Sequence, residues 1–249
     1  MSGHSKWATI KRKKGANDAQ RGKIFTKLGR ELAVAVKTGG SPDPTVNSRL
    51  KDVIAKCKSN NMPNDTIMRS IKKASGEGAS TNYEENVYEG YGPNGVAVIV
   101  ETLTDNKNRT ASDMRHYFDK FGGNLGTSGC VMFMFDKKGI ILIENDGSLD
   151  EEQVMMDALE AGADDVEANE DGFEITTDPN NVSTVSEALE GMGYAIAQAE
   201  AQFVPQTETA LSDEHDILMM NKLIEHLEDN DDVQNVWHNL DNLPEDEEE

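Results

Sequence analysis

The sequence has few of the residues that build disulfide frameworks, metal clusters or membrane spans. Its 249 residues include only two cysteines, Cys57 and Cys130, with no CxxC pair. A disulfide scaffold or a cysteine-based zinc site is therefore excluded, and the pattern fits a reducing compartment. No apolar run approaches the roughly 20 residues of a membrane span, and no hydrophobic segment follows the basic N-terminus. We therefore expect a soluble cytoplasmic protein that has no membrane partner.

Catalytic motifs are equally scarce. The five histidines are scattered, and there is no HExxH pair, P-loop or nucleophile elbow. Residues 90–95 (GYGPNG) match the letters GxGxxG, but a strand and not a helix is expected after them, so a turn between strands is predicted. Residues 167–178 resemble a calcium loop without its first Asp and last Glu, and a hairpin turn is predicted there. No enzyme activity, cofactor, metal or small-molecule substrate is therefore expected.

What the sequence does contain is a strong separation of charge. Residues 1–75 hold 17 Lys or Arg and 5 Asp or Glu, a balance of +12, whereas the remainder holds 7 basic and 41 acidic residues. The overall net charge of −22 conceals this basic block. A protein built in this way is expected to meet a polyanion with its N-terminal part and to keep its acidic part away from it. Nucleic acid is the predicted partner.

The first 21 residues carry the densest positive charge. Lys6 stands beside Trp7, and Lys11, Arg12, Lys13 and Lys14 follow as a continuous cluster. Glycines and the absence of an apolar period predict an arm or irregular segment. The cluster is interpreted as a phosphate contact. Two roles stay open for Trp7: its ring stacks on an unpaired base, or it plugs into the protein while the lysines face outward.

Three amphipathic helices are expected after the arm. Over residues 23–38, Phe25, Leu28, Leu32 and Val36 share one side of a helix, and Lys23, Lys27 and Arg30 form a basic ridge on the other. Residues 46–57 and 64–73 repeat the pattern and expose further Lys and Arg. A basic three-helix bundle ending near Ser75 is therefore predicted, followed by a linker at 76–82.

Beyond the linker the apolar period changes from 3.6 to 2. Strands are expected at 87–91, 95–102 and 130–135, with a helix at 108–121 between the last two. Residues 139–204 read as βαββαβ, the ferredoxin-like order. A helix at 213–227 and the segment VQNVW then close the second domain.

The predicted fold class is therefore α+β, with the basic helical bundle followed by two α/β-sandwich domains, one of them a ferredoxin-like unit inserted in the other. The expected domains are residues 1–75, residues 83–136 with 205–240, and the inserted residues 137–204. The acidic residues 241–249 are expected to be disordered.

One polar stretch in the acidic part stands out. Residues 103–110 (LTDNKNRT) precede a predicted helix, so their amide and acidic side chains can cap it. Lys107 and Arg109, two of the few basic residues in this part, are candidate ligand contacts. The full set of candidate nucleic-acid-binding residues is Lys6, Trp7, Lys11, Arg12, Lys13, Lys14, Arg21, Lys23, Lys27, Arg30, Lys107 and Arg109.

Several long motifs resemble one family. GHSKW, RGKIFTKL, NNMPND, IKKASGE, YEGYGPNGVAVIVETLTDNKNRT, FGGNLG and DDVQNVW are similar to motifs of the YebC/PmpR family, which includes the mitochondrial translational activator of cytochrome oxidase. The resemblance implies three domains, with the first helical and basic and the third inserted in the second. Trp237 stands where the family pattern has tyrosine, and residues 15–17 vary an alanine-rich stretch.

The resemblance leaves two functions open. Many bacterial members are described as DNA-binding transcriptional regulators of promoters. Others resemble translation factors that act on the ribosome, through ribosomal RNA or tRNA, during difficult proline-rich synthesis. The residues themselves favour nucleic acid without choosing DNA or RNA, since both are phosphate polymers. A scaffold protein without nucleic acid does not account for the basic block. The prediction is a nucleic-acid-binding regulator of gene expression.

Overall fold

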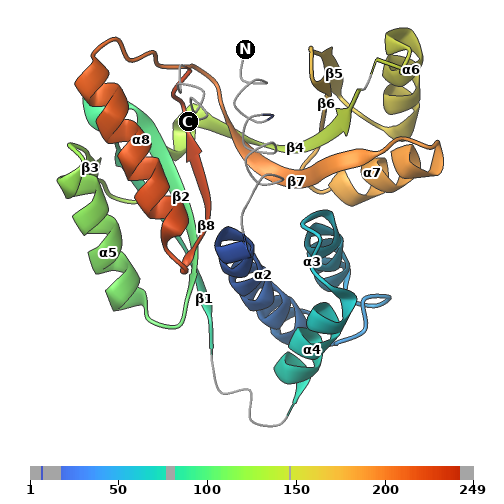
Figure 1. The fold of residues 1–249 in the computed structure, drawn as a ribbon, viewed down its shortest axis with the longest axis horizontal. Coiled ribbons are helices and arrows are strands. Elements are labelled where there is room, and N and C mark those ends of the chain that lie inside the picture. Colours follow the sequence, from blue (N-terminus) through green and yellow to red (C-terminus); the bar gives the residue numbers. More distant parts are fainter. Residues whose placement is uncertain (1–6, 8–17, 77–81, 146, 242–249) are drawn as a thin grey trace. The chain divides into compact units, whose positions relative to one another are not determined.

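The computed structural model describes residues 7, 18–76, 82–145 and 147–241. The described chain divides into two compact units, a larger one of residues 18–135 and 205–241 and a smaller one of Trp7 and residues 136–204. The α+β class is confirmed, with a helical region followed by two sheets of four antiparallel strands each (Figure 1). Within the described ranges, no helix combines the length and apolarity needed to cross a bilayer. The tail 242–249 lies outside the described residues.

The helical region consists of α2 (Asp18–Gly39), α3 (Ser48–Ser59) and α4 (Asn64–Ser75). Its core is formed where the apolar stripe of α2 meets the two shorter helices, through Leu28, Leu32, Val36, Leu50, Cys57, Ile67 and Ile71. The predicted stripe of α2 is thus confirmed. The side chain of Asn47 caps α3 by accepting from Leu50 N, and its amide donates to the carbonyl of Ala35 on α2.

The first sheet has the strand order β3-β1-β2-β8. Its strands are β1 (Glu84–Tyr91), β2 (Ala97–Thr104), β3 (Asn124–Leu125) and β8 (Val233–His238). Two helices, α5 (Lys107–Lys120) and α8 (Glu214–Asp229), pack on one face of this sheet (Figure 1). Val98 and Val100 of β2 contribute to the core that these helices close, together with Phe118 and Leu223.

The motif at 90–95 forms a turn between strands, as predicted. A 3₁₀ turn, η1 (Pro93–Gly95), joins β1 to β2. Gly95 has a φ of +82°, a conformation that glycine adopts without strain. A Cβ on Gly92 would stand 2.6 Å from the sulfur of Met220, so this glycine lets α8 approach the turn closely. The glycines of the motif therefore serve packing and turn geometry.

The predicted strand at 130–135 is wrong. These residues form a turn followed by the 3₁₀ helix η2 (Met132–Met134), and β4 starts only at Phe135. The carboxylate of Glu89 accepts hydrogen bonds from the backbone N–H groups of Val131 and Met132. Because these donors are already engaged, the segment cannot offer them to a neighbouring strand. Its continuous apolar run therefore does not form the buried strand that was predicted.

The second sheet belongs to the βαββαβ segment, as predicted. It runs β4 (Phe135–Glu144), α6 (Glu151–Ala161), β5 (Asp165–Ala168), β6 (Gly172–Thr177), α7 (Val182–Gly191) and β7 (Ile196–Pro205). The strand order β5-β6-β4-β7 is the ferredoxin-like order. The stretch that resembles a calcium loop is the hairpin between β5 and β6, where the side chain of Asn169 accepts from the N–H groups of Asp171 and Gly172.

Candidate nucleic-acid interface

The outer surface of the helical region carries exposed positive charge. The basic side chains exposed on α3 and α4, away from the bundle core, include Lys58, Arg69, Lys72 and Lys73. Arg21 is exposed near the start of α2. The helical periodicity had indicated that the four residues on α3 and α4 are exposed, but they were not among the candidate binding residues. A polyanion can reach all of them without rearrangement of the bundle.

The basic ridge of α2, which was predicted to face outward, contacts other parts of the protein, although the Lys23 side chain is still 45% exposed. The Lys23 ammonium pairs with Asp229 at 2.8 Å, and the Lys27 ammonium donates to the carbonyl oxygen of Glu228 at 2.6 Å. These partners form the C-terminal end of α8, where backbone carbonyls and carboxylates attract cations. The ridge therefore docks the helical region onto the α8–β8 turn. Lys23, Lys27 and Arg30 therefore each have a protein partner, and their role as contacts for nucleic acid stays a prediction.

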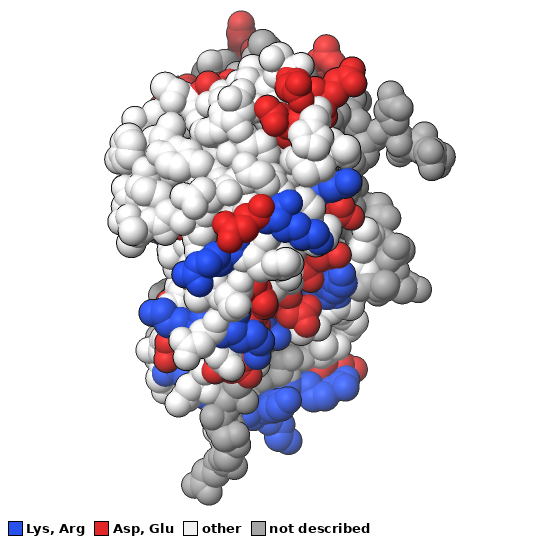
Figure 2. Space-filling model, turned by 90° about the vertical axis from the view of Figure 1, so that its left-hand side faces the viewer, with Lys and Arg blue, Asp and Glu red and all other residues white. Residues whose placement is uncertain are grey.

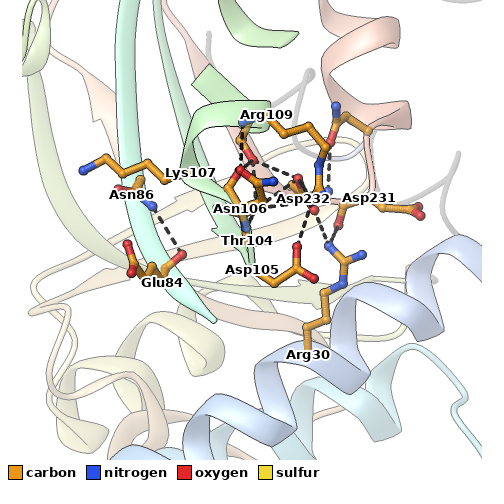
Figure 3. Close-up of polar contacts among 12 residues, drawn as sticks. Arg30, Glu84, Asn86, Thr104, Asp105, Asn106, Lys107, Arg109, Asp231 and Asp232 are labelled. Carbon is orange, nitrogen blue, oxygen red and sulfur yellow. Dashed lines mark hydrogen bonds and ion pairs between the residues drawn. The ribbon is translucent and has the colours of Figure 1, made fainter. Parts of the chain in front are cut away.

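The centre of this docking contact is the carboxylate of Asp232, which is 5% exposed (Figure 3). Its Oδ1 accepts from Arg30 Nη1 at 2.7 Å. Its Oδ2 accepts from Arg109 Nη2 at 2.7 Å and from the hydroxyls of Thr110 and Thr104 at 2.8 and 3.1 Å. Arg30 also donates to the carbonyl oxygen of Asp231 at 2.7 Å. A single buried carboxylate thus joins α2, β2, α5 and the start of β8.

The polar stretch at 103–110 is mostly structural. Asn106 caps α5 by accepting from Arg109 N at 3.1 Å, which confirms the capping interpretation. Arg109 is held between Asp105, at 3.0 Å, and Asp232. Lys107 is exposed, and its side chain points away from this cluster (Figure 3). Of the two basic candidates in the stretch, Lys107 is exposed, and Arg109 is paired with carboxylates although its side chain is 48% exposed, so contact of either with a ligand stays a prediction.

Ionisation of Asp232 is favoured in the folded protein. Burial opposes its charge, but hydrogen bonds from Arg109, Thr110 and Arg30 outweigh burial and lower its pKa. In the unfolded chain the pKa is about 3.9. The stabilisation is therefore complete above that value and is lost as the pH falls through the lower folded pKa.

We expect the free energy of unfolding to fall more steeply with acidification in the wild type than in Asp232→Asn between about pH 5 and pH 3. Urea unfolding at a series of pH values measures this slope. Asp231→Asn is the matched control and keeps the wild-type slope, because the exposed Asp231 contributes only its backbone carbonyl to Arg30. Equal slopes for the wild type and Asp232→Asn would show that Asp232 does not titrate in the expected way.

Trp7 plugs into the protein instead of presenting its ring to a base. The side chain is 2% exposed and packs with Ile140 and Leu142 on the sheet of the smaller unit. A Cβ on Gly172 would stand 2.9 Å from the indole ring, so the ring fills the space beside this glycine. The stacking role is therefore wrong for this conformation. Lys6 and the cluster at 11–14 lie outside the described residues.

Within the described part of the chain, no three His, Cys, Asp or Glu side chains are grouped so that they could hold a metal ion. Both cysteines are free thiols. The buried Cys57 thiol lies in the core of the helical bundle, and burial raises its pKa to about 12. A thiol with this pKa stays protonated at neutral pH and is a poor nucleophile.

The fold and surface define a class of protein in which a basic helical region precedes two α+β parts. Comparison with known proteins then identifies the family. The model of the TACO1/YebC N-terminal domain matches residues 5–77, and the model of the TACO1/YebC second and third domain matches residues 83–240. The chain belongs to the TACO1/YebC family.

Close relatives cover the chain from end to end. A probable transcriptional regulatory protein of Acetivibrio thermocellus is 66% identical over 96% of this chain and 98% of the relative. Another of that name, from Ruminiclostridium cellulolyticum, is 63% identical over the full length of both. The crystal structure of a conserved hypothetical protein from Aquifex aeolicus is 44% identical, has a TM-score of 0.80, and covers 90% of this chain and 91% of that one.

Proposed function

We propose that this protein is a nucleic-acid-binding regulator of gene expression that acts through its basic N-terminal region. The observation that carries the proposal is the segregation of charge, with 17 basic and 5 acidic residues through Ser75 and 41 acidic residues after it. The exposed Lys58, Arg69, Lys72 and Lys73 belong to that region. Lys6, the cluster at 11–14, Arg21 and Lys107 are the further contacts that we propose.

The relatives' name favours transcription. Two relatives that match nearly the whole chain are both named probable transcriptional regulatory protein, and neither is named for a reaction. The first form of the proposal is therefore a cytoplasmic DNA-binding transcriptional regulator whose partner is promoter DNA. Helices and basic arms suit the grooves and phosphates of duplex DNA.

A second form is a ribosome-associated translation factor that binds ribosomal RNA or tRNA and assists proline-rich synthesis. Two glycine-rich loops favour it, because Gly95, Gly122 and Gly129 face open space, where backbone without side chains can approach an RNA strand closely. These loops lie side by side, since Gly90 and Tyr91 of β1 pair with Leu125 and Asn124 of β3. In this form the acidic domains project toward a functional centre while the basic region sits on RNA.

Both forms require binding that weakens strongly with salt. Each neutralised phosphate contributes about −0.9 to the slope of log affinity against log salt for duplex DNA and about −0.7 for single strands. We expect slopes of at least about −4 for a DNA duplex or a structured RNA, corresponding to about five phosphate contacts. Fluorescence anisotropy between 50 and 300 mM salt measures them. Absent or salt-independent binding to both probes would contradict the proposal.

A further inference from the structure

The loop between β3 and β4 is fixed by a buried carboxylate. Glu89 of β1 is 4% exposed and accepts from the backbone N–H groups of Gly129, Val131 and Met132 at 2.6, 3.0 and 2.8 Å. Burial disfavours its charge, but these three donors together prevail and lower its pKa. The carboxylate is therefore ionised at neutral pH, when it is the best acceptor for the three N–H groups.

Further bonds hold the same loop at both ends. The Tyr91 hydroxyl donates to the carbonyl of Cys130 at 3.1 Å, and Gly126 N donates to the carbonyl of Glu89 at 2.8 Å. After η2, Gln206 N donates to the carbonyl of Met134 at 2.9 Å. The loop between β3 and β4 is thus anchored to β1 and to the segment that follows β7. This anchoring makes the position of η2 well defined.

In η2, at the end of the anchored loop, Phe133 is 70% exposed. Leaving a phenyl ring in water forgoes the roughly 1.5–3 kcal/mol that its burial would contribute. Its neighbours Met132 and Met134 are only partly exposed. An aromatic ring held outward by a rigid loop is the arrangement used by stacking platforms for single-stranded nucleic acid.

Phe133 belongs to a long uncharged run in an otherwise acidic part of the sequence. Residues 121–135 and 90–100 contain no Asp, Glu, Lys or Arg, and they are the two longest uncharged runs after Ser75. The pairing of β1 with β3 places the two runs together. On the face of the molecule drawn in Figure 2, a broad upper area carries neither colour of charge. A phosphate backbone that follows the two uncharged runs meets no carboxylate of their own.

We propose that Phe133 stacks on an unpaired nucleobase, with the glycine-rich loops at 90–95 and 122–129 accommodating the adjoining sugar-phosphate chain. This inference rests on the proposed function and names its ligand class, a nucleic acid with an accessible unpaired base. A protein partner fits less well, because one exposed aromatic ring between two partly exposed methionines is a small apolar surface for a protein interface. Glu89 is the positioning residue for Phe133.

The test compares two RNA duplexes of the same length, one fully paired and one with a central bulge of three unpaired nucleotides, and the same pair in DNA. Wild-type protein is expected to prefer the bulged probe by roughly 10-fold or more, the effect of one stacked base. Phe133→Ala and Phe133→Leu are expected to abolish the preference while binding the paired duplex unchanged. Phe133→Trp is expected to retain it.

Two further variants distinguish a failure of the stacking proposal from a failure of the proposed nucleic-acid-binding function. Reversal of Lys72 and Lys73 to Glu is expected to weaken binding to the paired and bulged probes equally, which tests the basic region independently of the loop. Glu89→Gln, checked for folding by circular dichroism, is expected to lose the bulge preference as Phe133→Ala does. A preference that is absent in the wild type or unchanged in Phe133→Ala would overturn the stacking proposal and leave the proposed function standing. If the wild type bound none of the probes, both the stacking proposal and the proposed function would be contradicted.

Comparison of the RNA probes with the DNA probes shows whether the unpaired base belongs to RNA or to DNA. Preference for bulged RNA alone assigns the site to RNA, and equal preference assigns it to unpaired nucleotides of either kind. A photoreactive phenylalanine analogue at position 133 provides the check in cells. We expect nuclease-sensitive crosslinks to nucleic acid. Crosslinks to a protein that survive nuclease treatment, without any nucleic-acid product, would contradict the proposal.

Discussion

Replacing Asp232 by alanine is expected to lower the free energy of unfolding by about 3 kcal/mol, because loss of one partner leaves buried charges and hydroxyls without their acceptor. Arg30 loses its carboxylate partner, and Thr104 and Thr110 lose the acceptor for their hydroxyl groups. Arg109 keeps Asp105, which limits the loss on that side. Urea unfolding followed by circular dichroism gives the difference.

The neighbouring residue supplies the control for Asp232→Ala. Asp231 is exposed, its side chain points away from the cluster (Figure 3), and Arg30 contacts only its backbone carbonyl, so Asp231→Ala is expected to change stability by less than about 0.5 kcal/mol. Asp232→Asn keeps the shape and one acceptor oxygen, and an intermediate loss is expected. Similar losses for the alanine variants at 231 and 232 would show that the carboxylate is not the centre of the docking contact.

Reversing Lys11, Arg12, Lys13 and Lys14 to Glu is expected to weaken nucleic-acid binding by at least about 100-fold at physiological salt. Four lost phosphate contacts account for most of this loss, and repulsion from four new carboxylates adds to it. The salt slope is expected to become shallower by about 3 or more. Anisotropy titrations at several salt concentrations measure both quantities with the same labelled probe.

An adjacent pair of lysines outside the basic region tests whether the place of the positive charge determines the affinity for nucleic acid. Lys137 and Lys138 belong to β4 of the smaller unit, and their reversal to Glu is expected to change affinity less than 3-fold. Reversal of the exposed pair Lys72 and Lys73 changes charge by the same amount and is expected to cost about 10-fold or more. Equal effects of the two pairs would mean that net charge, and not the basic region, governs binding.

Local periodicity was sufficient to predict most of the fold. Leu28 and Leu32 recur at helical spacing and lie in the bundle core, and the βαββαβ order of 139–204 produced the ferredoxin-like sheet. These elements could be predicted because each depends on apolar residues that lie only a few positions apart in the sequence. The turn at 90–95 was likewise predicted from what precedes and follows it.

The errors came from partners that lie far away in the sequence. The continuous apolar run at 130–135 resembles a buried strand, but Glu89, about 40 residues earlier, accepts hydrogen bonds from two of its backbone N–H groups. Lys27 and Arg30 occupy the polar face of a helix, and only folding brings Glu228 and Asp232 to them across about 200 residues. Helical periodicity identifies a face but does not tell whether solvent, a ligand or another domain covers it.

Trp7 illustrates the same limit for a single residue. A tryptophan beside a lysine is compatible with stacking on a base and with insertion into a core, and its sequence neighbours do not distinguish the two. The ring proved to be buried against Ile140 and Leu142, more than 130 residues away. Phe133, by contrast, was expected inside a buried strand and is exposed on a fixed loop.

The central claim is that the basic N-terminal region brings this protein to nucleic acid in the cell. Crosslinking the tagged wild type and the variant with residues 11–14 reversed in growing cells, followed by sequencing of both the DNA and the RNA recovered, tests it most directly. We predict crosslinks at discrete sites that the reversal removes. Promoter sites would establish a transcriptional regulator, and a few positions in ribosomal RNA or tRNA would establish a translation factor. Crosslinks that are absent, or identical in the two proteins, would contradict the account.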